Sequence, residues 1–176
     1  GLAASLPTLL VNQVFHGMCK KQLPIADLAR EINLRQRMSM PIGCFTALGV
    51  GVIDNFNHTI EIWNGGLPDF YVINNQEIIK QFSSQHVFSG ILNDEAFDDT
   101  TEIWSWKEPC DLFLYSDGIT DLLNKDKQAF GTQQLKHCLT QSESNNRITY
   151  LQSHVNDFID KEQEQDDISC LLIHCH

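Results

Sequence analysis

The spacing of hydrophobic residues predicts two helices at the start of the chain. Apolar residues recur about every four positions from Leu6 to Met18, which is typical of a helix with one broad buried face. Pro7 fits only the first turn of a helix, so we expect this helix to begin near Ser5. A similar pattern predicts a second helix over residues 25–38.

The pattern then changes to a period of two, which predicts strands. Residues 44–54 are apolar on both alternating faces, which favours a strand covered on both sides. We expect residues 101–106 and 111–116 to pair as a hairpin around Lys107-Glu108-Pro109. The other predicted strands are residues 59–64, 70–74, 77–82 and 168–174, and further helices are predicted at 129–139 and 145–161.

This order of elements indicates the fold class. The strands follow one another instead of alternating with helices, which favours an α+β fold with helices packed on antiparallel sheet. A G-x-G-x-x-G fingerprint and a G-x-x-x-x-G-K-[ST] loop are both absent from the sequence. Nucleotide binding therefore has no support in the sequence.

Composition and charge narrow the classes of partner. The 176 residues suffice for one domain, and 42% hydrophobic with 20% charged residues excludes a disordered chain. Twelve basic against 23 acidic residues give a net charge of −11, which argues against nucleic-acid binding. The longest apolar run, residues 45–53, is too short to span a membrane. Six cysteines without a C-x-x-C pair indicate reduced thiols, and with no secretory signal we expect a cytoplasmic protein.

Aspartates at the ends of two predicted strands are candidates for binding a divalent cation. The apolar strand 111–116 leads directly into Asp117-Gly118, where the strand would hold the carboxylate rigidly and the glycine allows close backbone approach. The alternative is that Asp117 caps a short helix over residues 119–123. Asp166-Asp167 opens the final strand, although such a pair can also be a solvated loop. Mg²⁺ and Mn²⁺ need carboxylate oxygens from separate elements, which two strand-end motifs could supply. The acidic run at residues 94–99 is a rival source of ligands, but it is more typical of a solvated surface.

Two segments contain the aspartate motifs: DLFLYSDGITDLLNKDKQAFG, in which a strand leads into Asp-Gly, and QDDISCLLI, the last predicted strand. With two further segments, and in the same order along the chain, they resemble the metal-dependent protein phosphatases (the protein phosphatase 2C or PPM family), and most closely their bacterial SpoIIE/RsbU-type branch. The first segment is similar to the one in which a strand delivers a metal-binding Asp-Gly, and the second resembles the terminal strand. FTALGVGVID with TIEIWNGGLPDFYVI resembles the central strands. GLAASLPTLL resembles the helix after the first metal motif, of which Gly1 would be the last glycine. The chain begins with Gly1 and not Met, so we expect a longer parent protein.

The resemblance implies a fold, a domain and a set of site residues. It implies an α-β-β-α sandwich of antiparallel sheets, with residues 1–176 forming one phosphatase domain whose first metal-binding motif lies upstream of Gly1. It assigns Asp117, Gly118 and Asp166 to the metal site. Asp121, four residues after Asp117 and on the same side of a short helix, is a candidate for orienting water beside the metal, and the alternative is a surface helix residue. One departure is Leu67, which stands where the family has histidine in an N-x-G-H turn.

The resemblance also implies an activity. The intact domain would use two Mn²⁺ or Mg²⁺ ions to hydrolyse a phosphoserine or phosphothreonine ester on a regulatory protein, of the anti-sigma-factor antagonist type. An upstream sensor or response-regulator receiver domain would place the domain in signal transduction. The domain could also form homodimers. In the family, an aspartate in the first metal-binding motif bridges both metal ions. Since the resemblance places that motif upstream of Gly1, we expect this chain to bind metal weakly and to be inactive alone. The alternatives are a degenerate phosphatase-like module that binds a partner, and a purely structural module.

Overall fold

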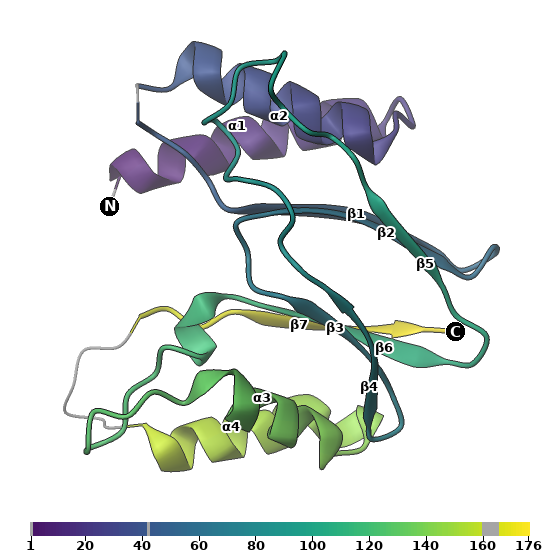
Figure 1. Ribbon diagram of the computed structural model, residues 1–176, viewed down its shortest axis with the longest axis vertical. Coiled ribbons are helices and arrows are strands. Elements are labelled where there is room, and N and C mark those ends of the chain that lie inside the picture. Colours follow the sequence, from purple (N-terminus) through teal and green to yellow (C-terminus); the bar gives the residue numbers. More distant parts are fainter. Residues whose placement is uncertain (1, 42, 160–165) are drawn as a thin grey trace. The chain divides into compact units, whose positions relative to one another are not determined.

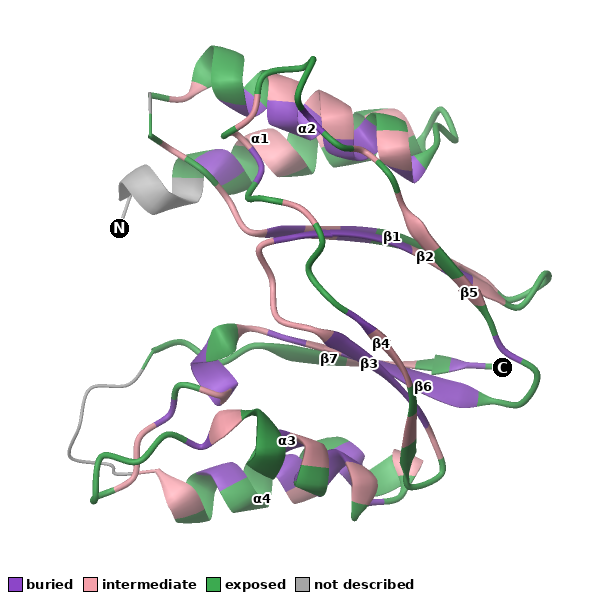
Figure 2. Ribbon diagram, in the orientation of Figure 1, coloured by how far each residue is buried: buried purple, intermediate pink, exposed green. Residues whose placement is uncertain are grey.

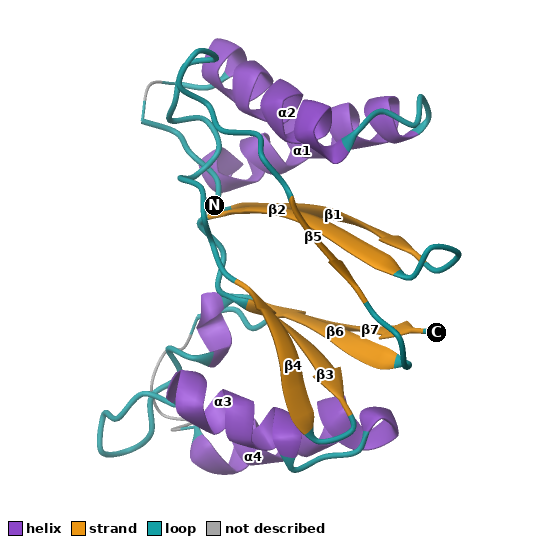
Figure 3. Ribbon diagram, turned by 45° about the vertical axis from the view of Figure 1, so that its right-hand side comes forward, coloured by secondary structure: helices purple, strands orange, loops and turns teal. Residues whose placement is uncertain are grey.

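The chain folds into two compact units, each assembled from two stretches of sequence (Figure 1). The computed structural model describes residues 2–41, 43–159 and 166–176, with side chains from residue 6 onward. Unit 1 comprises Gly1–Leu67 and Ser84–Ser105, and unit 2 comprises Pro68–Ser83 and Trp106–His176. Within these described residues, each unit contains one antiparallel sheet and two α-helices, and Figure 3 shows how helices and strands are arranged in each.

Unit 1 combines two helices with a three-stranded sheet. Its helices are α1 (Leu2–Cys19) and α2 (Ile25–Ser39), and its strands are β1 (Leu48–Asp54), β2 (Thr59–Gly65) and β5 (Glu102–Ser105), in the order β1-β2-β5. Helix α2 buries one face (Figure 2), and its apolar residues pack with the fully buried Trp63 of β2. The predicted second helix and the predicted strand 59–64 are confirmed, each with its end extended by one residue.

Two predictions for unit 1 were wrong in detail. Helix α1 begins at Leu2 and not near Ser5, so Pro7 lies inside the helix, where it lacks an N–H to donate. Strand β1 begins at Leu48 because Thr46 instead pairs with Ser89, each backbone N–H donating to the other's carbonyl at 2.9 Å. The second half of β1 is also exposed or half-buried, so β1 is not covered on both faces.

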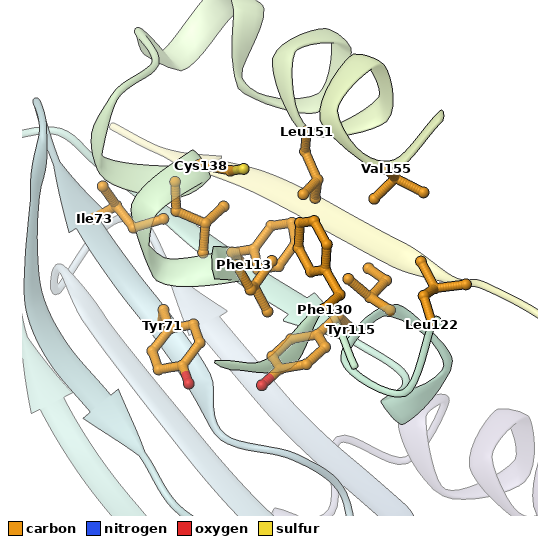
Figure 4. Packing of buried hydrophobic residues seen from close by; sticks show 12 residues of the cluster. Tyr71, Ile73, Phe113, Tyr115, Leu122, Phe130, Cys138, Leu151 and Val155 are labelled. Atoms are coloured by element: carbon orange, nitrogen blue, oxygen red, sulfur yellow. The ribbon is translucent and has the colours of Figure 1, made fainter. Parts of the chain in front are cut away.

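Unit 2 combines a four-stranded sheet with helices on one face. Its strands are β3 (Phe70–Asn74), β4 (Glu77–Phe82), β6 (Cys110–Tyr115) and β7 (Cys170–Cys175), in the order β4-β3-β6-β7. Its helices are α3 (Gly131–Thr140) and α4 (Arg147–Phe158), with short 3-10 helices η1 (Asp117–Ile119) and η2 (Ser144–Asn146). The core lies between helices and sheet: Figure 4 shows Leu151 and Val155 of α4 against Phe113 of β6 and neighbouring rings.

The hairpin expected from residues 101–106 and 111–116 does not form. Strand β5 pairs with β2 in unit 1, whereas β6 pairs with β3 and β7 in unit 2. The burial of the two strands gives the physical reason. Five of the six residues of β6 are buried, as suits a central strand with a neighbour on each side, whereas β5 alternates between half-buried and exposed, as suits an edge. The turn residues at 107–109 therefore mark a change of sheet.

The remaining elements of unit 2 follow the predictions closely. Strands β3 and β4 have the predicted bounds, α3 begins two residues later than expected, and β7 begins at Cys170 instead of residue 168. Helix α4 ends at Phe158, and residues 160 and 161 of the predicted helix lie outside the described residues. The α+β fold class with antiparallel strands is confirmed. Within the described part of the chain, no helix is both long and apolar enough to cross a bilayer.

Candidate functional site

The pairing of β6 with β7 brings the two aspartate motifs to the same end of the unit 2 sheet. The two strands are antiparallel, and their register ends with Tyr115 opposite Cys170. One step further, the Ser116 N–H donates a hydrogen bond to the Ser169 carbonyl at 2.9 Å. Asp117 follows this point on one strand and Asp166 precedes it on the other. The strand register therefore joins two motifs that are far apart in sequence.

The hydroxyl of Ser116 adds a second connection between the motifs. The Ser169 N–H donates to Ser116 Oγ at 3.0 Å, and Oγ also lies 3.5 Å from the Asp167 carbonyl oxygen. Ser116 is thus a positioning residue that ties the start of the Asp117 loop to the end of the Asp166 loop. Sequence reasoning did not single out Ser116, and the only signal was its place between a buried strand and Asp117.

Gly118 is buried where the two loops pass closest to each other. A Cβ built at this position would lie only 2.2 Å from the Asp167 carbonyl oxygen, which no side chain can tolerate. The close backbone approach that we expected of this glycine is therefore present, and its neighbour is the backbone of Asp167. The assignment of Gly118 to a metal site stays a prediction.

The three candidate carboxylates are all exposed to solvent. Asp117 is the first residue of η1, and its carbonyl accepts hydrogen bonds from the Asp121 N–H at 3.0 Å and the Thr120 hydroxyl at 2.9 Å. The expected short helix over residues 119–123 is thus a tight 3-10 turn, in which Asp117 lies inside and Ser116 occupies the N-cap position. Asp166 Oδ1 accepts a hydrogen bond from the Asp167 N–H at 2.8 Å.

The candidate ligands are of the chemical kind that a hard cation prefers, but they are too few to hold it. Carboxylate oxygens are the ligands that Mg²⁺ and Mn²⁺ prefer. The strand register brings the two aspartate motifs to one end of the sheet, but no group of three or more His, Cys, Asp or Glu side chains within the described residues is arranged to hold a metal ion. The assignment of Asp117 and Asp166 to a metal site stays a prediction.

The acidic run at residues 94–99 has a structural role in unit 1. The Arg30 guanidinium donates to Asp94 Oδ1 and to Asp99 Oδ2, both at 2.8 Å. These hydrogen bonds raise the pKa of Arg30 above its usual value. The run thus joins α2 to the segment before β5, and these two carboxylates are engaged by an arginine.

The turn that departs from the family pattern lies in unit 1, at the end of β2. Asn64 is 3% exposed, and its Oδ1 accepts a hydrogen bond from the Leu67 N–H at 3.2 Å. Gly65 is packed so closely that a Cβ there would lie 2.4 Å from the Trp63 ring. This hydrogen bond and the close packing hold the backbone turn in place. The side chain at its end is the apolar Leu67, where the family has histidine.

Comparison with known proteins identifies the family. The model of the family described as Stage II sporulation protein E (SpoIIE) matches residues 1–176. The chain belongs to the SpoIIE family. The resemblance predicted from the sequence is therefore confirmed. A relative, Protein IcfG of Synechocystis sp., is 26% identical over 134 residues, which are 74% of this SpoIIE-family chain and 20% of IcfG. The chain thus spans about a fifth of that curated relative.

Solved structures show the same fold for this SpoIIE-family chain. The SiaA-PP2C domain of Pseudomonas aeruginosa superposes with a TM-score of 0.79 at 12% identity, covering 97% of this chain and 68% of that one. The PP2C phosphatase domain of SpoIIE from Bacillus subtilis gives 0.74 at 15% identity, covering 94% and 48%. RsbX, solved in complex with magnesium, gives 0.68 at 10% identity, covering 98% and 74%. The predicted PP2C-like fold class is confirmed.

Proposed function

We propose that this SpoIIE-family chain forms most of one metal-dependent protein serine/threonine phosphatase domain, completed by a first metal-binding motif upstream of Gly1. The observation that carries the proposal is the meeting of the Asp117 and Asp166 motifs where β6 joins β7. The family and the fold support the same activity. The substrate would be a phosphorylated regulatory protein of the anti-sigma-factor antagonist type, and a sensor or receiver domain in the parent protein would control the reaction.

Each residue of the site has a distinct role in this proposal. Asp117 and Asp166 would hold Mn²⁺ or Mg²⁺, which when bound lowers the pKa of a water molecule and neutralises charge on the phosphoryl oxygens. Asp121 follows Asp117 after one tight turn and is exposed, so its carboxylate can accept a proton from a water molecule in the site. Ser116 and Gly118 keep the two loops in contact.

Electrostatics explains why such a site would need cations. The two loops carry Asp117, Asp121, Asp166 and Asp167, all of them exposed. A phosphoryl group brings about two further negative charges, which these carboxylates repel. Only a divalent cation between the carboxylates and the phosphate converts this repulsion into attraction. We therefore expect no hydrolysis in the presence of a chelator.

A second candidate function is a phosphatase-like module that binds a partner without catalysis. Two observations favour it: Leu67 replaces the family's histidine, and no three-residue ligand group is present within the described residues. The upstream motif distinguishes the two candidates, because catalysis requires the ligands that it would supply.

The test compares variants of the parent protein, extended upstream of Gly1, on a phosphoserine peptide with Mn²⁺. Asp117→Asn and Asp166→Asn keep the side-chain shape and remove the charge, and we expect each to lower the rate by at least about a hundredfold, since a bound metal contributes several kcal/mol. Asp126→Asn is the matched control, because Asp126 is exposed in the same unit and outside both loops. We expect the control to keep its rate within about twofold, because surface substitutions change little.

Two outcomes would count against the proposal. An unchanged rate for Asp117→Asn would exclude this carboxylate as a ligand. An extended protein that binds Mn²⁺ but releases no phosphate would favour the partner-binding module. The 176-residue chain alone should bind Mn²⁺ weakly in a calorimetric titration and show no turnover.

A further inference from the structure

Two cysteines face each other at the opposite end of the β6–β7 ladder from Asp117. Cys110 begins β6, Cys175 ends β7, and the two are direct partners in the antiparallel register. Directly opposite residues in such a ladder have Cα atoms about 4.5–5.5 Å apart and side chains on the same face. A disulfide spans Cα separations of about 4.4–6.8 Å. Both residues are free thiols, so the pair has the backbone geometry of a cross-strand disulfide in its reduced state.

The two thiols differ in pKa because their side chains interact with each other. This interaction lowers the pKa of Cys175 and raises that of Cys110. Burial and the nearby Asp111 carboxylate oppose the effect on Cys175, while His174 adds to it. Since the thiolate is the reactive form of cysteine, Cys175 is the member of the pair that attacks an oxidant first.

A cavity lies against the strand ends that carry this pair. It has a volume of about 500 Å³, lies wholly within unit 2, and is lined by Cys110 and Cys175 together with polar groups that include Ser144 and His174. Cys138 of α3 is equally buried in the same unit, but it belongs to the core and does not line this cavity.

We propose that Cys110 and Cys175 form a reversible disulfide when the protein meets a hydroperoxide. The Cys175 thiolate attacks one peroxide oxygen and the O–O bond breaks, which leaves a sulfenic acid on Cys175 and a hydroxide that takes up a proton. The Cys110 sulfur then attacks Cys175 Sγ; the S–S bond forms, the S–O bond breaks, and water leaves with the thiol proton. Two thiols lose two electrons, and hydrogen peroxide becomes two water molecules. A thiol reductant reverses the reaction.

The disulfide would fix the two strands that position the aspartate motifs. It would link the start of β6 to the end of β7, while Ser116 and Ser169 join the same strands at their other ends. The cross-link closes a long loop, which restricts the unfolded chain and stabilises the fold. This inference rests on the ladder and the cavity, so it does not depend on the proposed phosphatase activity.

The test is a map of cysteine oxidation in the wild-type chain. Hydrogen peroxide is added at a few equivalents, free thiols are blocked with iodoacetamide, and the chain is digested without reduction and analysed by mass spectrometry. We expect a cross-linked pair of peptides that contain Cys110 and Cys175, a loss of two of the six thiols, and recovery of all six after dithiothreitol. The thermal midpoint of the oxidised protein should rise.

Two cysteine variants distinguish specific pairing of Cys110 with Cys175 from unspecific oxidation of the thiols. Cys175→Ser should abolish cross-linking of Cys110, whereas Cys138→Ser, the matched buried control, should leave it unchanged. The inference is overturned if wild-type Cys175 proceeds to sulfinic acid without pairing, or if Cys110 stays reduced while other cysteines cross-link. The wild-type map decides the question even where a variant folds poorly.

Discussion

Replacing Arg147 with methionine should strongly destabilise the fold. Arg147 is the first residue of α4 and is 1% exposed. Its Nη1 donates to the buried Asp111 carboxylate, Nε donates to the Leu139 carbonyl at 3.0 Å, and Nη2 donates to the carbonyls of Asn75 at 2.6 Å and Ser142 at 3.1 Å. One guanidinium thus connects α4 to β6, to the end of α3 and to the β3–β4 turn.

The expected cost follows from the groups that would lose their partner. Arg147→Met leaves Asp111 as a buried carboxylate whose remaining partners, among the described residues, are Ser144 at 3.0 Å and His174 at 2.7 Å. Breaking a buried ion pair by removing one member costs about 3–5 kcal/mol. Methionine fills a similar volume, so the cost reports the polar contacts. For a chain of this size, that corresponds to a fall in the thermal midpoint of about 6–20 °C.

Urea unfolding followed by circular dichroism measures the effect. The matched control is Arg35→Met, because Arg35 forms an exposed (i,i+4) pair with Glu31 at 2.6 Å, and such pairs contribute less than about 0.5 kcal/mol. Adding Asp111→Asn to Arg147→Met should recover part of the loss, because the second change removes the unpaired charge. A cost below about 1 kcal/mol for Arg147→Met, or strictly additive losses in the double variant, would refute this reasoning.

Two further predictions concern unit 2. Gly118→Ala should cost about 1–3 kcal/mol in urea unfolding, because its Cβ collides with the Asp167 carbonyl; an unchanged midpoint would contradict the observed close approach. Burial raises the pKa of both Tyr71 and Tyr115 above the value of about 10 expected in the unfolded chain, so their contribution to stability is complete below pH ~10 and is lost as the pH rises further. Ultraviolet absorbance should show both tyrosines ionising together with unfolding, and their ionisation in a still-folded protein would contradict this.

Local patterns were sufficient to predict the elements that form from neighbouring residues. Helix α2 follows from its hydrophobic period, and the β3–β4 hairpin follows from two short apolar runs around Asn75, which adopts a positive φ of 52°. The assignment of β5 to a different sheet from β6 was missed because strand pairing depends on distant partners. Burial of β6 on both faces, and not the turn at 107–109, decides its neighbours.

In the candidate site, too, local features could be predicted from the sequence, whereas a contact between distant residues could not. Asp117-Gly118 and Asp166 were predicted together from two strands that each carry an acidic residue at one end, and the resemblance to the phosphatase family pointed to the same residues. Ser116 was missed because its partner Ser169 lies far along the sequence, and a serine hydroxyl carries no local sign of a contact over that distance. The strand register between β6 and β7 is what brings these groups together.

Each unit is built from two stretches of the chain that alternate with those of the other unit, so neither unit is one continuous piece of sequence. The β3–β4 hairpin belongs to unit 2, but the stretches on both sides of it, Gly1–Leu67 and Ser84–Ser105, belong to unit 1. No single cut can therefore separate the whole of one unit from the whole of the other. A protease acting within Ser84–Ser105 would leave two fragments that each hold part of both units, so neither fragment contains a complete unit. Producing unit 2 alone would require a new linker from the hairpin to Trp106.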